Sequence, residues 1–361
     1  MKDSNKRARK FRFFTAIALT AYLLCVVFPI LEGLSATNKE KLTVEALHSS
    51  GQAECVMELR SRRIFYEQNA DVRLPMASTT KILTAITAIE RCGEIKRTIE
   101  IADQAIGVEG SSVYLNKEES YTVEDLLYGL MLRSGNDCAV ALSHYISGGV
   151  DEFCALMNQT AEKAGALNSR FVNPHGLPQE NHYTTARDLT KIACYAMHNT
   201  LFRKIVSTKY YANKAWANKN KILFNYEGGC GVKTGYTKQA GRCLVAAAER
   251  NGMTLVCTLL NCPTTYERTA SLLDDAFSRY KNRQILQDGQ TFDVVINGEA
   301  LCLQAKDEFS YPMLDEELEY IEIQTNGAEN VKKSDEKGEI LGQIKIYLLK
   351  RLLFLGNLYK L

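Results

Sequence analysis

Ser78-Thr79-Thr80-Lys81 leads directly into Ile82-Leu83-Thr84-Ala85-Ile86, an apolar run that indicates the centre of a domain. The residues from Lys81 to Glu90 favour a helix, and apolar side chains lie on nearly all of its faces. A helix of this kind is buried at the centre of a domain rather than laid on its surface. Two short motifs follow, Ser134-Gly135-Asn136 and Lys233-Thr234-Gly235. The sequence therefore predicts a buried helix with three polar motifs around it.

The segments on either side predict an α+β domain. Residues 51–70 alternate enough for two strands, joined by the turn Arg60-Ser61-Arg62-Arg63. Many helices come next, then strands, then one closing helix, which is not the regular alternation of a βαβ fold. The predicted elements are helices over 122–145 (broken at Ser134-Gly135-Asn136), 151–164 and 185–197, strands over 230–236, 242–248 and 254–260, and a helix over 269–280.

A second domain is predicted from about residue 283. Short alternating segments over 292–296, 320–323 and 340–347 are separated by turn pairs such as Asn297-Gly298. This pattern is typical of a small all-β domain, which we place over 283–346. The last residues, 347–361, form an apolar run that also carries Lys350, Arg351 and Lys360.

The first 36 residues predict export from the cytoplasm. Six basic side chains precede residue 13 against the single Asp3, an apolar run covers 13–31, and Leu34-Ser35-Ala36 offers a small residue at a processing site. The apolar run is nearly long enough to span a bilayer. Residues 1–36 are therefore either a cleaved signal peptide or an N-terminal anchor.

The overall composition excludes some classes of function. A formal net charge of +2 over 361 residues gives no support for a nucleic-acid partner. Ten cysteines follow Cys25, none in a Cys-x-x-Cys pair and several in apolar runs, so we expect mostly free, buried thiols. No cluster of His and Cys has metal-ligand spacing. We expect neither a metal nor another cofactor.

The first motif has the composition of an activated serine nucleophile. Serine at its ordinary pKa is a poor nucleophile and needs a base within hydrogen-bond reach. Three positions along a helix place Ser78 and Lys81 on one face, a single turn apart. Burial and the positive end of the helix would both lower the pKa of Lys81. A neutral amine could then accept the Ser78 proton.

The other two motifs supply the remaining parts of such a site. The Ser134 hydroxyl can pass a proton to a leaving amine, and the Asn136 amide can hold a substrate amide. Lys233 and Thr234, on a predicted strand, suit a substrate carboxylate, and Gly235 lets a substrate backbone approach closely. Alone, each motif is more often a helix cap, a turn or a strand end. Together, each in its required context, they predict acyl transfer at a serine.

The chain resembles the serine-type D-alanyl-D-alanine carboxypeptidases, or low-molecular-mass penicillin-binding proteins. The three motifs match the Ser-x-x-Lys, Ser-x-Asn and Lys-Thr-Gly set of penicillin-recognising enzymes. The resemblance extends from about Thr43 to Tyr347. It is carried by the segments Pro75–Lys81, Met131–Asp137, Phe171–Leu177, His182–Leu189 and Gly231–Thr237.

This resemblance implies a mechanism and a partner. Ser78 would attack the bond between two D-alanines of a peptidoglycan stem pentapeptide, with Lys81 as base and Ser134 as proton relay. Lys233 would receive the terminal carboxylate, and the backbone N–H groups of Ser78 and Tyr236 would form the oxyanion hole. Substrate-binding residues would be Asn136, Lys233, Thr234, Gly235 and Tyr236. β-Lactams would acylate the same serine.

The resemblance also implies the architecture and the location. We expect a β-lactamase/transpeptidase-like catalytic domain over 37–282, with an antiparallel sheet flanked by helices and a helical subdomain. The small β domain would then be followed by an amphipathic helix over 347–361 on the outer face of the cytoplasmic membrane. If that helix does not bind the membrane, an exported protein would be secreted.

Alternatives to this function stay open at this point. A DD-endopeptidase would use the same chemistry on cross-linked peptides. A class A β-lactamase is less well supported, because Glu162 and Asn168 do not have the Glu-x-x-x-Asn spacing of its deacylating site. A scaffold that binds penicillin without turnover is the non-catalytic alternative. An additional carboxylate-binding arginine, Arg242 or Arg268, is conceivable but lies in no convincing motif.

Overall fold

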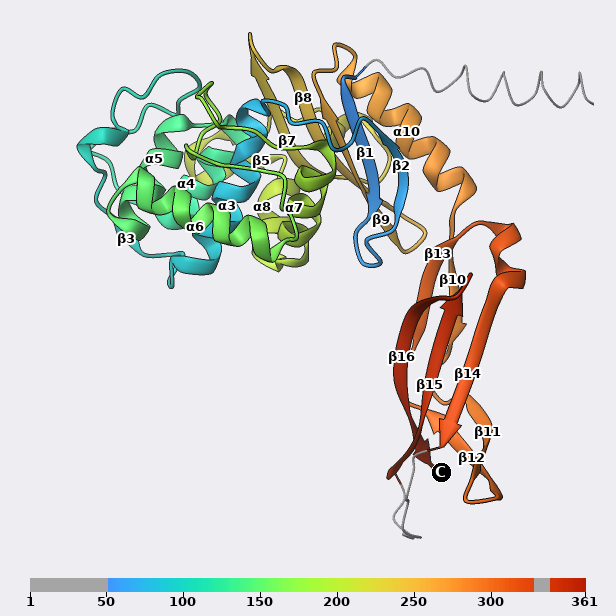
Figure 1. Cartoon of the computed structure of the whole chain (residues 1–361). Helices are drawn as coiled ribbons and strands as arrows, with labels where there is room; N and C mark the ends of the chain where they lie inside the picture. Colours follow the sequence, from blue (N-terminus) through green and yellow to red (C-terminus); the bar gives the residue numbers. More distant parts are fainter. Residues whose placement is uncertain (1–50, 328–337) are drawn as a thin grey trace, which may run out of the picture. The chain divides into compact units, whose positions relative to one another are not determined.

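The computed structural model describes residues 51–327 and 338–361 (Figure 1). The predicted export segment over 1–36 lies outside these residues. Among the helices that are described, none is both long and apolar enough to cross a membrane.

A five-stranded antiparallel sheet forms the framework of the larger, N-terminal part of the described chain. Its strand order is β2-β1-β9-β8-β7. The first two strands join the last three through the pair of β1 with β9, although the helices lie between them in the sequence. The two strands predicted over 51–70 are confirmed as β1 and β2. The bounds are β1 Ala53–Glu58, β2 Ile64–Gln68, β7 Gly229–Thr237, β8 Gly241–Arg250 and β9 Met253–Leu260.

Both faces of this sheet are covered by helices. Helix α7 (Ala186–His198) contacts β1 and β9, while α10 (Thr265–Arg279) packs on β8 and β9 from the other side (Figure 1). Every residue of β1 is buried as a result. A strand covered on both faces has no need of polar alternation, which explains the near-continuous apolar run of β9.

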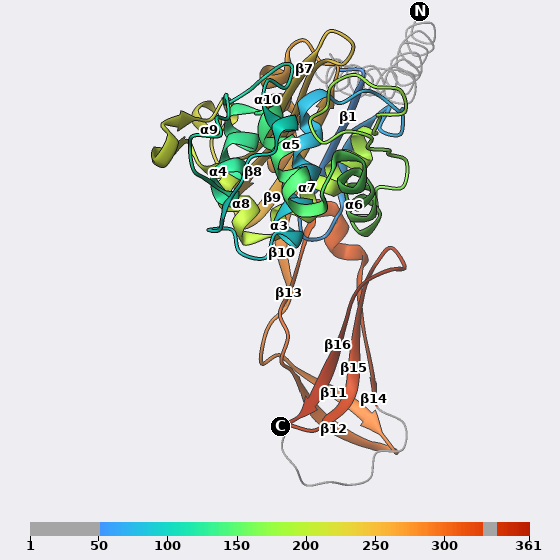
Figure 2. The ribbon, with the colours of Figure 1, turned by 90° about the vertical axis from the view of Figure 1, so that its left-hand side faces the viewer.

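Helix α3 (Lys81–Arg91) is the central helix that the sequence predicts. All residues from Lys81 to Ala88 are buried, and α3 contacts α5, α6, α7 and α8. Figure 2 views the molecule from the side of these helices, with the sheet behind them. The other helices are α4 Val123–Tyr128, α5 Asn136–Ser147, α6 Val150–Lys163, α8 Thr200–Ser207 and α9 Ile222–Asn225. Short hairpins pair β3 Thr98–Ile99 with β4 Tyr121–Thr122 and β5 Tyr210–Tyr211 with β6 Trp216–Ala217.

The C-terminal part is all-β, as predicted. Its five-stranded sheet has the order β11-β12-β16-β15-β14, and β10 pairs with β13 beside it. Leu303, Ile344, Ile346 and Leu358 are fully buried in its core. The bounds are β10 Lys281–Leu286, β11 Thr291–Ile296, β12 Glu299–Ala305, β13 Phe309–Met313, β14 Ile321–Gly327, β15 Ile340–Leu348 and β16 Arg351–Lys360.

The amphipathic helix predicted over 347–361 is wrong. β15 runs to Leu348, a two-residue turn follows, and β16 returns along β15. Leu349 and Lys350 both have positive φ, which is the backbone of the tight hairpin turns that join twisted strands. Phe354 contributes to the β domain, because it pairs with Ile346 and stacks on the Phe309 ring with centroids 4.9 Å apart, and Leu358 is fully buried.

The cysteines agree with the expectation of free thiols. Cys55, Cys92, Cys138, Cys154, Cys194, Cys243 and Cys257 are free and buried, while Cys230 and Cys302 are free and less buried. Burial raises the pKa of Cys138 well above its usual range, because the thiolate would lose its hydration there. These thiols therefore act as small apolar core groups.

Candidate active site

Ser78 lies in a tight turn that leads into α3. Residues Ala77–Thr80 form a 3₁₀ turn, and Ala77 adopts a positive φ of 50°. The next two hydroxyls close the turn onto the carbonyls before it: Thr79 Oγ1 donates to Met76 O at 2.6 Å and Thr80 Oγ1 to Ala77 O at 2.8 Å. The serine stays partly exposed while its neighbours are buried. The turn therefore presents one hydroxyl from an otherwise closed structure.

Lys81 is fully buried directly behind this serine. Its Nζ lies 3.0 Å from Ser78 Oγ, 2.6 Å from Asn136 Oδ1 and 2.7 Å from His175 O. Desolvation, and next the positive charge of Lys233, lower the pKa of Lys81 well below its usual range. The predicted pairing of Ser78 with Lys81 is present in the structure.

The three contacts of Lys81 fit a neutral amine. Such an amine has two N–H groups and one lone pair. The two N–H groups satisfy Asn136 Oδ1 and His175 O, neither of which can donate a proton from that atom. The lone pair then faces Ser78 Oγ, whose hydroxyl can donate to it. The geometry can thus draw a proton from Ser78 without any rearrangement.

The second motif follows an irregular helix. A π-helical turn over Gly129–Arg133 ends at Ser134, whose φ of 67° is left-handed, and α5 starts at Asn136. This break places the Ser134 hydroxyl on the cleft beside Ser78. Gly135 has no room for a side chain, because a Cβ there would lie 2.6 Å from Asp137 Oδ1 and 2.9 Å from Cys138 Sγ. The local packing therefore favours glycine at the middle position of the Ser-Gly-Asn motif.

Asn136 contacts the protein at both ends of its amide. Its Oδ1 accepts from Lys81, and its Nδ2 donates to Glu109 O at 2.5 Å. In this arrangement the amide orients the lysine, and it does not line the cleft. Its binding of a substrate amide remains a prediction.

A turn outside the three motifs completes the surroundings of Lys81. Residues Asn173–Leu177 contact α3 through two carbonyls, Pro174 O with Thr84 Oγ1 at 2.6 Å and His175 O with Lys81 Nζ. The Asn173 side chain closes this turn by accepting from Gly176 N–H at 2.7 Å. Burial is the main cause that lowers the pKa of His175 to about 4, so its ring is neutral at physiological pH. Phe171–Leu177 is one of the segments that carry the resemblance, but its residue types do not predict that a backbone carbonyl here binds Lys81.

The third motif lies on the edge strand β7. Lys233 is almost fully buried and donates from Nζ to Thr234 O at 2.9 Å. Desolvation, with a smaller contribution from the charge of Lys219, lowers the pKa of Lys233 to about 7. A Cβ on Gly235 would lie 3.0 Å from Met76 O and Thr79 N, so a side chain here would push β7 slightly away from the turn that carries Ser78.

One cleft of about 490 Å³ brings the motifs together. Ser78, Ser134, Thr234, Gly235 and Tyr236 line it, whereas Lys81, Asn136 and Lys233 are buried behind its wall. Six more lining residues were not predicted as site residues or were left undecided. They are Ser111, Lys219, Arg242, Cys243, Thr265 and Tyr266.

The two arginines considered from the sequence have different surroundings. Arg268 is buried and bound by Glu54, with Nη2 to Oε2 at 2.7 Å, and it also donates to Tyr66 Oη. Arg242 is exposed at the cleft, opposite Tyr236 in the β7–β8 pair. Lys219 also lines the cleft, and desolvation followed by the charge of Arg133 lowers its pKa. Cations suited to an anionic ligand therefore come from Lys219 and Arg242 as well as from Lys233.

Comparison with known proteins agrees with this geometry. Residues 39–264 match the D-alanyl-D-alanine carboxypeptidase family. D-alanyl-D-alanine carboxypeptidase DacF of Bacillus subtilis is 33% identical over 270 residues, which cover 71% of this chain and 69% of the relative.

Solved structures show the same fold. Penicillin binding protein 5 from Haemophilus influenzae superposes with a TM-score of 0.70 at 26% identity, covering 86% of this chain and 96% of that one. The DD-transpeptidase of Streptomyces K15 gives a TM-score of 0.60 at 32% identity, covering 63% and 97%. The predicted fold class is thereby confirmed. The chain belongs to the D-alanyl-D-alanine carboxypeptidase family.

Proposed function

We propose that Ser78 attacks the peptide bond between the last two D-alanines of a peptidoglycan stem pentapeptide. The observation that carries this proposal is the buried Lys81 amine, 3.0 Å from Ser78 Oγ and held by two acceptors that fix its lone pair on the serine. A lysine kept neutral by burial is a competent general base.

The proposed reaction has two stages. Ser78 Oγ bonds to the carbonyl carbon as its proton passes to Lys81 Nζ, and the N–H groups of Ser78 and Tyr236 donate to the oxyanion. The C–N bond then breaks, and the proton travels from Lys81 through the Ser134 hydroxyl to the departing D-alanine amine. Water next attacks the ester carbon, gives a proton to Lys81 and releases the shortened peptide. That proton returns to Ser78 Oγ.

The substrate carboxylate is proposed to lie along β7. The Thr234 hydroxyl and the Tyr236 backbone line the cleft there, and the charges of Lys233 and Lys219 favour an anion. β-Lactams present the same carboxylate and a reactive amide, so they would acylate Ser78. We further propose that residues 1–36 direct the protein out of the cytoplasm. Peptidoglycan lies outside the cytoplasmic membrane, so export would bring the enzyme to its substrate.

The first prediction tests the nucleophile. Ser78→Ala should release no D-alanine from a diacyl-D-Ala-D-Ala peptide and take up no fluorescent penicillin, because no other group can form the ester. Wild-type protein should do both. Retention of the label by Ser78→Ala would overturn the assignment, and labelling of wild type without peptide turnover would favour the scaffold.

A DD-endopeptidase is the second candidate, because a D-alanyl-D-alanine endopeptidase of Escherichia coli is 27% identical over 241 residues. Mass spectrometry of wall peptides digested with the enzyme separates the two. Loss of one alanine from pentapeptides supports the carboxypeptidase, and loss of cross-linked dimers supports the endopeptidase. A β-lactamase has less support, since none of the described residues that line the cleft is acidic.

The second prediction concerns pH. With a pKa of about 7, Lys233 is charged below pH 7 and neutral above it in the free enzyme. The ratio of kcat/KM for a D-Ala-D-Ala peptide to that for its C-terminal carboxamide should fall by up to about tenfold as pH rises through 7. Titration of Lys81 affects both substrates and cancels in the ratio. The ratio should be flat with pH in Lys233→Met, and a pH-independent ratio in wild type would contradict the prediction.

A further inference from the structure

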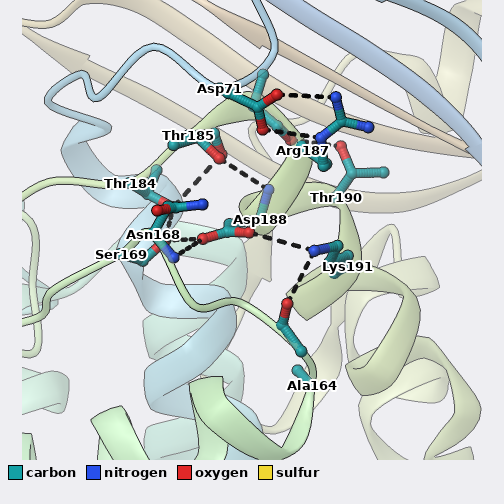
Figure 3. Close-up of polar contacts among 12 residues, drawn as sticks. Asp71, Ala164, Asn168, Ser169, Thr184, Thr185, Arg187, Asp188, Thr190 and Lys191 are labelled. Atoms are coloured by element: carbon teal, nitrogen blue, oxygen red, sulfur yellow. Dashed lines mark hydrogen bonds and ion pairs between the residues drawn. The ribbon is translucent and has the colours of Figure 1, made fainter.

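Residues His182–Asp188 contact the chain just before the turn that carries Ser78, and they also contact the turn itself. Thr184 and Leu74 exchange two backbone hydrogen bonds, of 2.8 and 3.0 Å, just before that turn. Arg187 donates from Nε to Asp71 at 2.8 Å, as Figure 3 shows. Asp188 accepts from Asn168 N–H at 2.6 Å and from the Ser169 hydroxyl at 2.9 Å (Figure 3). The segment is therefore fixed to its surroundings along its whole length.

His182 is the member of this segment that reaches the nucleophile turn itself. The ring is buried, and its Nε2 lies 3.0 Å from Thr80 Oγ1. Its Nδ1 accepts from Val172 N–H at 3.1 Å, and the Phe171 ring meets it edge to face. Both ring nitrogens are thus engaged inside the protein, away from the cleft.

The hydrogen bonds around His182 have one consistent direction. Because Val172 N–H can only donate, Nδ1 carries a lone pair and the proton of the neutral ring is on Nε2. The single Thr80 proton is used on Ala77 O at 2.8 Å. His182 Nε2–H therefore donates to Thr80 Oγ1, and the Thr80 hydroxyl donates to Ala77 O. A directed relay runs from the ring to the carbonyl of the residue before Ser78.

The relay ends at Ala77 O, and Ala77 has a strained backbone conformation. Ala77 has a left-handed φ of 50°, which costs a non-glycine residue about 1 kcal/mol or more. Its carbonyl is also pressed against Gly176, where a Cβ would lie 1.9 Å away. Release of this carbonyl would allow the peptide before Ser78 to rotate, and with it the direction of Oγ.

We propose that His182 is a positioning residue for Ser78, acting through Thr80 and Ala77 O. It touches no reacting atom; its effect is to hold the strained peptide that aims the serine at Lys81 and at the bound carbonyl. The inference rests on the proposed role of Ser78 as the nucleophile. Misplacement of a nucleophile by a fraction of an ångström lowers the rate of attack far more than the binding of the ligand.

The neutral state of the His182 ring agrees with these hydrogen-bond directions. Burial lowers the pKa of His182 to about 4, so the ring stays neutral over the physiological range. A protonated ring would direct a second N–H at Val172 N–H, two donors with no acceptor between them.

A matched pair of substitutions tests the relay. Glutamine places its amide nitrogen near the position of Nε2, so His182→Gln can still donate to Thr80. Asparagine reaches only the position of Nδ1, so His182→Asn keeps the acceptor for Val172 N–H and loses the donor. The readout is the acylation of full-length protein by fluorescent penicillin, resolved into an apparent dissociation constant and a rate constant at saturation.

The expected result is a difference in rate and not in binding. His182→Asn should lower the saturating rate constant by about ten- to a hundredfold and leave the dissociation constant within about threefold, whereas His182→Gln should stay near wild type. Thr80→Val should be at least as slow as His182→Asn, because it removes both hydrogen bonds of the relay. The double variant should be no slower than Thr80→Val alone.

A control is available on the same helix. The Thr87 hydroxyl is buried, and no partner for it is found among the described residues. Thr87→Val should therefore acylate as wild type does, while showing that a buried Thr→Val change in α3 is tolerated. Melting temperatures of all variants separate folding from rate.

Two results would overturn the proposal. Equal acylation rates for folded His182→Asn, His182→Gln and wild type would show that the ring donor is not needed. Additive losses in His182→Asn and Thr80→Val would show that they do not act through one bond. If His182→Asn does not fold, Thr80→Val decides alone, by its rate against that of Thr87→Val. Absence of labelling in wild type would instead contradict the proposed function.

Discussion

Lys81→Met should abolish acylation of Ser78, with a fall of about a thousandfold or more in the rate constant. Methionine fills a similar buried volume but removes the amine that lies 3.0 Å from Ser78 Oγ and would take its proton. The loss should be measured with fluorescent penicillin over hours, so that a slow residual reaction is detected.

Lys81→Arg tests whether Lys81 is needed as a base or only as a positive charge. A guanidinium keeps a positive charge but does not lose its proton in a protein, so it cannot act as the base. We expect Lys81→Arg to be as inactive as Lys81→Met. Substantial acylation by Lys81→Arg would mean that a positive charge near Ser78 is sufficient and that the base lies elsewhere. Far-UV circular dichroism and the melting temperature check that both variants fold.

Gly176→Ala has the second largest expected effect, because the new methyl group would meet backbone. Its Cβ would lie 1.9 Å from Ala77 O, and the φ of +92° at this position is unfavourable for alanine. The turn that carries Ser78 must shift by more than an ångström to make room. We expect acylation to fall at least a hundredfold and the free energy of unfolding to drop by about 2 kcal/mol or more.

Gly148→Ala is the matched control for this change. Gly148 has a φ of +80° at the end of α5, and a Cβ there would meet nothing within 4 Å. It therefore carries the same backbone penalty, about 1 kcal/mol, without the collision. Acylation by Gly148→Ala should equal that of wild type. The contrary result is that Gly176→Ala and Gly148→Ala show the same acylation rate and the same free energy of unfolding in urea. In that case the close contact between Gly176 and Ala77 would not matter for function.

The central elements of the fold could be predicted because their signals are local. The apolar residues on all sides of α3 indicate burial without reference to any other segment, and that helix is confirmed. The break at Ser134 was visible from Ser-Gly-Asn between two helical patterns, although its π-helical turn was not. The three motifs were recognised together because each lies in a stated local context.

The contacts that complete the site could not be predicted, since they depend on backbone groups and distant segments. His175 binds Lys81 through its carbonyl, which any residue type could supply. Lys219 and Arg242 line the cleft from a loop and from β8, with no pattern that distinguishes them from other exposed cations.

The C-terminal error has a different physical origin. An apolar run with scattered cations suits an amphipathic helix and a strand equally well when read alone. Pairing with β15 and the stacking of Phe354 on Phe309 decided the outcome, and both are interactions between segments. Tertiary contacts of this kind commonly override a local propensity.

The hydrogen bonds of Asp137 lower the entropy cost of ligand binding. Its carboxylate accepts from the Ser112 hydroxyl at 2.5 Å and from the N–H groups of Val113 and Leu115, while Asn136 N–H binds Ser111 O. The rim of the cleft near Ser111 is thereby joined to α5 and ordered when the protein folds. The conformational entropy of that rim is lost before any peptide arrives, so association does not have to supply it again. A peptide that docks there meets a preorganised wall, and the favourable contacts it makes are retained as affinity.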